Sequence, residues 1–364
     1  MNRQDACSTK SEFSCGTGIL PVKREWCKMC DRPHLQFYNI VAYNVRIAIA
    51  DKKTEIESMP KWLGKVLGIG AGTILLLGAT GYWYVFIAGA PQLDPPKVVA
   101  DPDLNFQLKT YKSAAMNSER TYGLILPPGY AKNPKQRYPV IFLLHGGHGD
   151  ARAYQDKAAV TSVLHDLYKS KRLPPSIVIT PDGNDKRGTS PLWDPQYFDG
   201  PNGKVGSAIG SELVEIVKSR YRTLEDPKFW AMGGQSSGGW GAFNIGLRYL
   251  NNFNILFSHS GYFTDQSGKA NSPKYLVEKL SVKDKQQLRA YLDAGEGDKN
   301  FLISTQQFHE QLNSLGIANE FNKFPGGHGI VGPDVGWNYW HKHLADSLSY
   351  VGKQFKISLA TQKK

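Results

Sequence analysis

The chain has 364 residues, of which 41% are hydrophobic and 12% aromatic, so it is long enough to bury one large core or two ordinary ones. Its formal charge is +12, but acidic and basic residues are interspersed and there is no long run of like charges. Without a nucleic-acid-binding motif, this charge excess does not indicate a nucleic-acid partner; it favours solubility or a weak preference for anionic surfaces.

The first 57 residues hold every cysteine of the chain, so no disulfide framework can hold the rest together. Two of them form a CxxC with His34 nearby, which is one half of a usual zinc ligand set. The other two are irregularly placed for the second half, so we interpret all four as incidental thiols and expect no metal site. We expect residues 1–57 to be a poorly ordered segment. The cysteines are Cys7, Cys15, Cys27 and Cys30.

Met59 precedes a basic and then apolar stretch of the kind found at natural protein N-termini. One hypothesis is therefore that translation begins at Met59 and that residues 1–58 are not made. Peptides from before Met59 in mass spectra of the native protein would contradict it.

Residues 66–90 form an uncharged run of 25 residues, long enough as a helix to cross a hydrocarbon core of about 30 Å. Aromatic residues at 82–84 suit a membrane interface, and lysines precede the run, which places the N-terminus in the cytoplasm. We expect a transmembrane signal-anchor helix within residues 58–90, with the rest of the chain extracytoplasmic, in the periplasm or at the cell surface. This topology puts the cysteines on the reducing side.

Cleavage is the alternative to an uncleaved anchor, because Ala88-Gly89-Ala90 resembles an A-x-A processing site. Pro91 follows immediately and should hinder processing, and the apolar run is longer than a usual signal peptide, so we favour the anchor. The next segment, residues 91–103, is rich in proline and is expected to be a stiff, extended spacer. A globular domain is expected over residues 104–358, followed by a short tail, 359–364.

Apolar or alternating runs predict strands, and amphipathic periodicity predicts helices between them. Because the apolar strands alternate with helices, we expect an α/β fold with a mostly parallel sheet flanked by helices. The expected strands are 106–115, 120–126, 138–144, 176–180, one from Phe229, 255–258, 288–292 and 318–324. The expected helices are 151–171, 205–221, 301–315 and 336–350.

The stretch FWAMGGQSSGGWGAFN, residues 229–244, matches G-x-S-x-G with Ser236 at its centre. A lone match also occurs in ordinary loops, but an apolar strand precedes this one and a helix start rich in small residues follows it. This is the pattern of a nucleophile elbow, in which flanking glycines let strand and helix approach closely. The helix N-terminus beneath Ser236 favours developing negative charge.

A serine nucleophile needs a base, and the candidate is His328 in the Gly-rich stretch FPGGHG, between the last predicted strand and the last helix. His341 and His343 are rivals, but they fall in a helical pattern, where packing or exposure explains them better. His145 and His148 precede the serine, which is the wrong order for an α/β-hydrolase sheet.

The acid that orients the base is expected in LDAGEGD, residues 292–298. Asp298 is the candidate, while Asp293 and Glu296 lie on the same loop and remain open as alternatives. For the oxyanion hole, we expect the backbone N–H of Ser237 and those of the HGGHG loop, at Gly147 and His148.

Further residues are expected on loops near the pocket, where they would bind substrate or simply pack the loop. Their aromatic rings suit a sugar or a phenolic acyl group, and the sequence favours binding and packing equally. They are Asp182, Trp193, Tyr197, Phe198 and Asp199.

From about Leu104 to Lys356 the chain resembles the esterase family of α/β hydrolases that includes esterase D (S-formylglutathione hydrolase), feruloyl, acetyl-xylan and enterochelin esterases, and mycolyltransferases. The matching pieces are TYGLILPPGY, YPVIFLLHGG, IVITPDG, GGQSSGGWGAF, FSHSGYF, LDAGEGD and PGGHG. The resemblance implies an α/β-hydrolase fold with Ser236 as nucleophile, His328 as base and Asp298 as acid. Ser237 stands where many members have Met or Leu, which leaves its backbone N–H available.

These observations predict a membrane-anchored serine carboxylic-ester hydrolase that acts through an acyl-enzyme, without metal or cofactor, on a small-molecule or saccharide-linked ester. Its membrane contact would be made by residues 66–90. Two alternatives stay open: an acyltransferase of the mycolyltransferase kind, with the same triad and a sugar acceptor, and a catalytically silent binding module at the cell surface.

Overall fold

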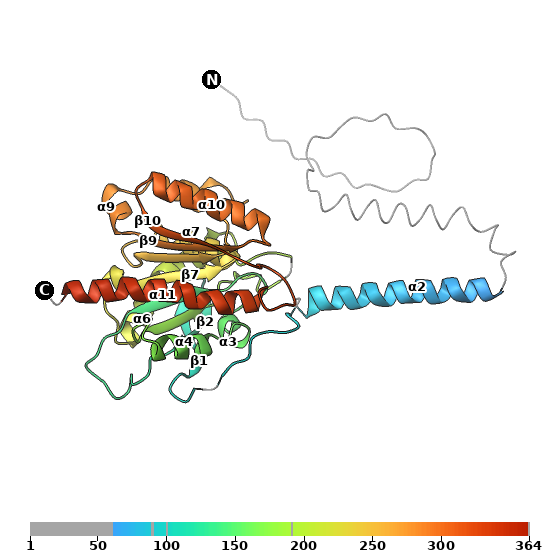
Figure 1. The fold of residues 1–364 in the computed structure, drawn as a ribbon, viewed down its shortest axis with the longest axis horizontal. Helices are drawn as coiled ribbons and strands as arrows, with labels where there is room; N and C mark the ends of the chain where they lie inside the picture. Colours follow the sequence, from blue (N-terminus) through green and yellow to red (C-terminus); the bar gives the residue numbers. More distant parts are fainter. Residues whose placement is uncertain (1–60, 89–90, 100, 191, 363–364) are drawn as a thin grey trace, which may run out of the picture. The chain divides into compact units, whose positions relative to one another are not determined.

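The computed structural model describes residues 61–88, 91–99, 101–190 and 192–362 (Figure 1). The chain divides between Leu75 and Leu76 into two units, the second of which carries the β-sheet. The expected N-terminal segment 1–57, its CxxC and residues 89–90 of the A-x-A stretch lie outside the described residues.

Helix α2, Lys61–Tyr82, continues into a short π-helical turn, η2, Trp83–Ile87. The stretch Trp62–Val85, 24 residues with a mean hydropathy of 1.6, is long and apolar enough to cross a membrane. Within it, the hydroxyls of Thr73 and Thr80 each donate to the carbonyl four residues earlier at 2.8 Å, so neither hydroxyl needs a partner outside the helix. By length and composition this helix fits the expected span.

The core of the second unit is a sheet of eight strands in the order β1-β2-β4-β3-β7-β8-β9-β10 (Figure 1). The pairs β1–β2 and β2–β4 are antiparallel, and all the other pairs are parallel. The strands are β1 (Phe106–Ser113), β2 (Ser118–Ile125), β3 (Val140–Leu144), β4 (Ile177–Pro181), β7 (Trp230–Gln235), β8 (Ile255–His259), β9 (Arg289–Gly295) and β10 (Ala318–Phe324).

The central strands β3, β4, β7 and β8 are buried at every residue, which explains their almost continuous apolar sequences. Strand β10 lies at the edge and is only half-buried. It carries Glu320 and Lys323, charges that discourage pairing with another strand. All eight strands fall where the sequence predicts them, within a few residues at their ends.

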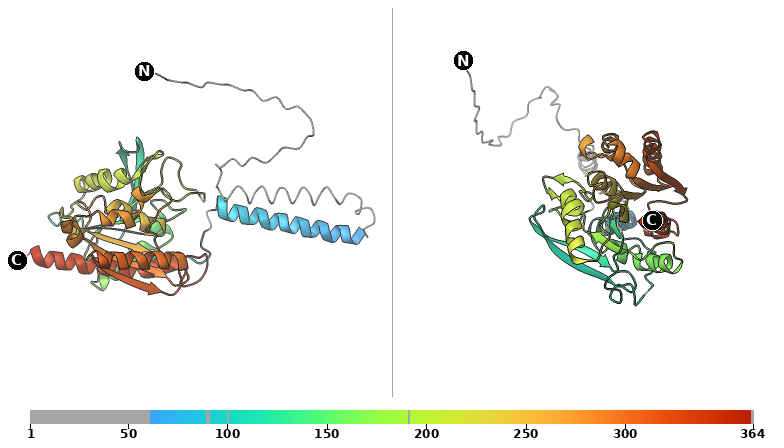
Figure 2. Two further views of the ribbon diagram at one scale, coloured as in Figure 1. Left: turned by 90° about the horizontal axis from the view of Figure 1, so that it is seen from above. Right: turned by 90° about the vertical axis from the view of Figure 1, so that its left-hand side faces the viewer.

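Helices cover both faces of the sheet (Figure 2). On one face α4 packs on α11, and on the other α7, α8 and α10 pack together over β7, β8, β9 and β10. The helices are α3 (Ala153–Asp156), α4 (Val160–Lys169), α5 (Val205–Ser207), α6 (Leu213–Arg220), α7 (Ser237–Gly246), α8 (Pro273–Glu278), α9 (Val282–Gln287), α10 (Lys299–Ser314) and α11 (Trp337–Gln362). A short hairpin is formed by β5 (Asp199–Gly200) and β6 (Gly203–Lys204), and short turns by η3 (Ala208–Glu212), η4 (Pro227–Phe229) and η5 (Lys269–Asn271).

Three predicted segments differ in detail. The expected helix 151–171 is broken at Ala159, whose left-handed φ of 48° separates α3 from α4. The expected helix 205–221 contains the π-helical turn η3. The expected tail from residue 359 is helical through Gln362, because no Gly or Pro follows Gly352 and Leu359 packs against the core.

The proline-rich segment 91–103 differs from a free spacer at its beginning. The Gln92 residue is only 8% exposed, and its side-chain oxygen accepts a hydrogen bond from the backbone N–H of Trp337. A buried amide needs such partners, and they come from the loop between β10 and α11. The segment is therefore attached to the domain that carries the sheet from its first residues.

The approach of α7 to the sheet leaves no room for a side chain at Gly238. A Cβ there would collide with the carbonyl oxygen of Leu144 and lie 2.6 Å from that of His145. We therefore expect Gly238→Ala to lower the free energy of unfolding by roughly 2–4 kcal/mol, because the backbone has to move. Gly316→Ala, where space is free and only a φ of +70° opposes the substitution, should cost about 1 kcal/mol.

Urea unfolding of the two variants and the wild type measures both costs. Equal destabilisation by the two substitutions would contradict the close approach at Gly238.

Candidate active site

Ser236 occupies the turn between β7 and α7 with φ 52° and ψ −124°, a conformation that L-residues rarely adopt. Hydrogen bonds to neighbouring backbone groups maintain this strained conformation. The N–H of Ser236 donates to the carbonyl of His259 at 2.9 Å, and its own carbonyl accepts the N–H groups of Gly239 and Trp240. Ser236 therefore sits at the carboxyl end of a central strand as a nucleophile elbow requires.

His328 and Asp298 lie together on the loops that follow β10 and β9. His328 Nδ1 donates to Asp298 Oδ2 at 2.7 Å, and the backbone N–H of His328 donates to Oδ1 at 2.8 Å. Because a carboxylate only accepts, this pair places the proton of the neutral imidazole on Nδ1. Nε2 is left able to accept a proton, and it has no hydrogen-bond partner among the described residues.

Two aromatic rings hold the imidazole of His328 in place. Phe301 stacks on it with ring centres 4.5 Å apart, and Trp340 meets it edge-on at 5.1 Å. His328 and Ser236 line the same cavity, of about 230 Å³. The arrangement brings together the three side chains that the sequence predicts for a Ser-His-Asp triad.

The pKa of the Asp298 carboxyl is set by two opposed effects. Burial favours the protonated acid, but the hydrogen bonds and charge of His328 outweigh burial and hold the pKa below its usual value. Asp298 is therefore a carboxylate at neutral pH, the form that can hold the imidazole tautomer and stabilise imidazolium.

The two other candidate carboxylates lie elsewhere, and Asp293 belongs to strand β9 rather than to the loop that the sequence predicted. Asp293 is fully buried and accepts hydrogen bonds from His259 Nδ1 at 2.7 Å and from the Tyr339 hydroxyl at 3.0 Å. Glu296 is exposed. Asp298 is thus the member of the three that contacts His328.

The rival histidines of α11 are engaged in packing. His341 Nδ1 lies 2.8 Å from the carbonyl of Ala158, and the buried His343 lies 2.8 Å from Asp346 and stacks on Phe324. Neither lines the cavity with Ser236.

The HGGHG loop after β3 lies against the elbow. A Cβ on Gly146 would come within 3.3 Å of the Cβ of Ser236, and Gly147 and His148 line the cavity. His148 has a φ of 57°, and its carbonyl accepts a hydrogen bond from Lys157 Nζ at 3.0 Å. Burial lowers the pKa of both His148 and Lys157. The loop and the start of α7 at Ser237 are where the sequence predicts the oxyanion hole.

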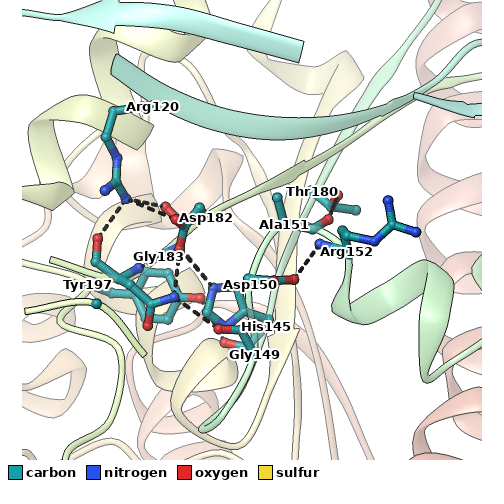
Figure 3. A network of polar contacts seen from close by, with 12 residues as sticks. Arg120, His145, Gly149, Asp150, Ala151, Arg152, Thr180, Asp182, Gly183 and Tyr197 are labelled. Carbon is teal, nitrogen blue, oxygen red and sulfur yellow. Dashed lines mark hydrogen bonds and ion pairs between the residues drawn. The ribbon is translucent and has the colours of Figure 1, made fainter. Parts of the chain in front are cut away.

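A buried polar network supports this loop from behind (Figure 3). His145 Nε2 accepts the N–H of Gly183 at 2.9 Å, so its Nδ1 carries the proton and donates to the Gly146 carbonyl at 2.9 Å. The Tyr197 hydroxyl donates to the His145 carbonyl at 2.7 Å (Figure 3). Each bond fixes the backbone that leads into Gly146 and Gly147.

Several predicted substrate-binding residues belong to this scaffold. Tyr197 is fully buried, so it cannot reach a substrate, and Asp182 lies beside His145 and Arg120 (Figure 3). Asp199 accepts hydrogen bonds from the N–H and hydroxyl of Ser207, the last residue of α5. The aromatic and acidic residues of this region are thus used mainly for packing, the alternative that the sequence left open.

Trp193 is the exception, because it lines an open groove beside the cavity, with Arg187 4.8 Å from its ring centre. Phe198 is half-buried and packs edge-on against Trp240. The groove also carries Asp194 and Phe301, and Asp194 reaches into the cavity as well.

The cavity contains residues that sequence reasoning missed. Gln235, between Gly234 and Ser236, is buried, and both polar atoms of its amide lack a partner among the described residues. Burial raises the pKa of the Asp194 carboxyl, although the nearby His148 and His328 oppose this. Of the residues missed, only Gln235 could have been found from the sequence, since it is part of the elbow motif. The residues missed are Gln92, Lys157, Asp194, Gln235, Trp337 and Trp340.

The Asp298–His328 contact predicts a pH dependence of stability. A carboxyl whose folded pKa is depressed stabilises the fold above its unfolded pKa, near the ordinary aspartate value of 3.8, and this contribution is lost as the pH falls through the folded pKa. We expect Asp298→Asn to lower Tm at pH 7, with a difference from wild type that shrinks as the pH falls below about 4. Thermal melts from pH 7 to pH 3 measure it, and a constant difference in Tm would contradict the pairing.

Comparison with known proteins identifies the family. Residues 113–351 match the model of the Esterase family, described as "Putative esterase". An esterase of Mycobacterium tuberculosis is 24% identical over 266 residues, which cover 62% of this chain and 56% of that protein. An endo-1,4-beta-xylanase/feruloyl esterase of Xylanibacter ruminicola is 26% identical over 222 residues, 59% of this chain and 28% of that protein.

Solved structures agree in fold. A ferulic acid esterase superposes with a TM-score of 0.61 at 24% identity, over 69% of this chain and 99% of that chain. The chain thus matches nearly the whole of that solved domain, whereas it spans about half the length of the mycobacterial relative. The likeness confirms the α/β-hydrolase architecture, and because the family model covers more than half of the sequence, this protein belongs to the esterase family.

Proposed function

We propose that this protein is a serine carboxylic-ester hydrolase with Ser236 as nucleophile, His328 as base and Asp298 as the acid that orients the base. One observation carries the proposal: His328 is bound to Asp298 through Nδ1 while its free Nε2 and Ser236 share a cavity. Membership of the esterase family supports the same reaction.

In the proposed reaction, Ser236 Oγ attacks the ester carbonyl and its proton passes to His328 Nε2. The oxyanion that forms would accept N–H groups of Ser237 and of the Gly147–His148 stretch. When the tetrahedral intermediate collapses, the alcohol leaves with the proton from His328, and an acyl-enzyme remains. Water then attacks the acyl carbon, gives its proton to His328, and releases the acid and free Ser236.

The cavity's size and lining suggest the kind of substrate. At about 230 Å³ it is smaller than the roughly 300–1,000 Å³ of pockets that enclose drug-sized ligands. The adjoining groove carries Trp193 and Tyr262, half-buried rings that suit stacking of a sugar or a phenol. A small-molecule or saccharide-linked ester, with a small acyl part in the cavity, fits both features.

We further propose that α2 anchors the protein in a membrane and that the esterase domain is extracytoplasmic. The proposal rests on the 24-residue apolar stretch and on the lysines that precede it in the sequence.

Hydrolysis of simple esters tests the nucleophile. We expect the protein to hydrolyse p-nitrophenyl acetate and Ser236→Ala to lose roughly 10⁴-fold or more in kcat/KM, because the variant lacks the hydroxyl that forms the acyl-enzyme in the proposed reaction. A fluorophosphonate probe should label the wild type and leave the variant unlabelled. Ser237→Ala, one residue away, is the matched control, since only its backbone N–H is used. Equal hydrolysis by wild type and Ser236→Ala would refute the proposal.

Substitution of the three loop carboxylates tests the acid. We expect Asp298→Asn to lose about 10³- to 10⁴-fold in kcat while it stays folded, because the imidazole tautomer is no longer held. Glu296→Gln should retain activity because its side chain is exposed. Asp293→Asn should lower Tm, because it disturbs a buried pair with His259. Enzyme kinetics and thermal melts of the three variants test which carboxylate orients His328. Full activity in Asp298→Asn would remove Asp298 from the proposed triad.

Extraction of membranes at alkaline pH tests the anchor. The full chain should remain with the membranes, because a span of this length inserts in an effectively irreversible way. A variant with two arginines in the middle of the span, Leu75→Arg and Leu76→Arg, should be released. Release of the wild-type chain would show that α2 does not anchor it.

A further inference from the structure

Three exposed apolar side chains lie where the segment after α2 meets the loop of the candidate base. Leu93 is 65% exposed, Ile330 46% and Val331 58%. The N–H of Leu93 donates to the carbonyl of Ile330 at 2.8 Å, so the two chain segments are neighbours here. We call these three residues the apolar rim.

The apolar rim borders the mouth of the active-site cavity. The cavity is lined by Pro91 and Gln92 on one segment and by His328 and Gly329 on the other. Leu93 and Ile330 are the next residues along each segment. The rim therefore lies directly beside the opening through which a substrate reaches Ser236.

Side-chain hydrogen bonds keep the two segments together. Gln92 Nε2 donates to the Val335 carbonyl at 3.2 Å, and its Oε1 accepts from the Trp337 N–H. Asp94 Oδ2 accepts the N–H of Gly332 at 3.0 Å, and its carbonyl accepts from the Asn338 side chain at 2.9 Å. This many specific bonds define a built surface rather than a chance contact of a linker.

The covalent chain limits how far this surface can be from the end of the apolar helix. Gln92 lies five positions after Ile87, the last residue of η2. A fully extended chain of five residues spans at most about 17 Å. If α2 is embedded in a bilayer, the mouth of the cavity is tethered within that distance of its end.

We propose that the apolar rim contacts the surface of the bilayer that holds α2, and that the enzyme acts on esters held in that bilayer. The substrate class is an ester of a small acyl group with a long apolar alcohol. The acyl group enters the cavity, while the alcohol stays in lipid beside the rim. The ester and water give the free acid and the alcohol, so this inference rests on the proposed hydrolysis and the proposed anchor.

The polar groups next to the apolar rim are compatible with contact between the rim and lipid. The nearest carboxylate, Asp94, is engaged by the Gly332 N–H and by Gln92 Nε2, so its approach to the interface costs less than that of a free carboxylate. Apolar side chains that enter the interface gain free energy in proportion to the area they bury. The apolar rim supplies that area. The proposed anchor keeps the rim near the bilayer at a high effective concentration, so a small apolar area is sufficient for contact with lipid.

A pair of esters with the same acyl group tests the inference. The full chain is reconstituted in phosphatidylcholine vesicles, and acetate release is measured from ethyl acetate in solution and from hexadecyl acetate in the same vesicles. We expect Leu93→Asp and Ile330→Asp each to lower the ratio of vesicle-borne to soluble rates by about fivefold or more, because a charge opposes contact with lipid. The double variant should lower it further.

Val282→Asp is the matched control, because Val282 is 72% exposed on α9, which precedes β9 and so lies at the opposite end of the sheet from the cavity. Its ratio should equal that of the wild type. Hydrolysis of ethyl acetate without hydrolysis of hexadecyl acetate overturns the substrate class. An unchanged ratio in the rim variants overturns the contact. Absence of both activities would count against the proposed function itself.

A measurement that does not depend on activity distinguishes failure of the proposed lipid contact from failure of the proposed hydrolysis. An environment-sensitive fluorophore is placed at Ile330→Cys or, as control, at Val282→Cys, in full chains whose four native cysteines are replaced by serine. Spin-labelled lipids should quench the label at position 330 and leave the label at position 282 unquenched. Equal quenching at both positions, or none at 330, would show that the rim does not rest on the bilayer.

Discussion

The strained turn at Ser236 depends on how closely three pieces of backbone approach one another. Strand β7 ends beside β3, and α7 begins so close to Leu144 that only glycine fits at position 238. The same approach brings the loop after β3 against Ser236, since that loop begins at His145. A single steric constraint therefore sets the conformation of Ser236, the candidate nucleophile, and the position of the expected oxyanion hole. Because β9 and β10 run parallel to β7, they end at the same edge of the sheet as β7. The loops that follow them therefore bring Asp298 and His328 to the edge where Ser236 lies.

Two histidine–carboxylate pairs lie near the elbow, and burial gives them different roles. In both, the ring Nδ1 is 2.7 Å from a carboxylate oxygen. His259 and Asp293 are fully enclosed, with the second ring nitrogen of His259 3.0 Å from the Ser347 hydroxyl, so this pair is closed to substrate. The His259 carbonyl holds the N–H of Ser236. The His328 side chain is 31% exposed and its second nitrogen is free, which suits proton transfer.

The sequence predicted the elements that depend on local pattern. Apolar and alternating runs located all eight strands of the sheet, and the motif order singled out Ser236, Asp298 and His328, of which the last two are in contact. It could not separate packing from binding at Tyr197 and Asp182, because that difference is set by burial against His145, 37 or more residues away in the chain. It also missed Gln92, because nothing local marks a glutamine whose partners lie at residues 335 and 337. Side chains that meet across such distances are visible only in the fold.

The contacts of Gln92 join two parts of the chain that the sequence treated as separate. A spacer would leave the esterase domain free to turn relative to its attachment point, with its active site facing any direction. Hydrogen bonds from Gln92 and Asp94 hold the start of this segment against the loop of His328 instead, so the chain enters the domain at the rim of its own cavity. The residues that begin the domain and those that border the mouth of the cavity are therefore the same few.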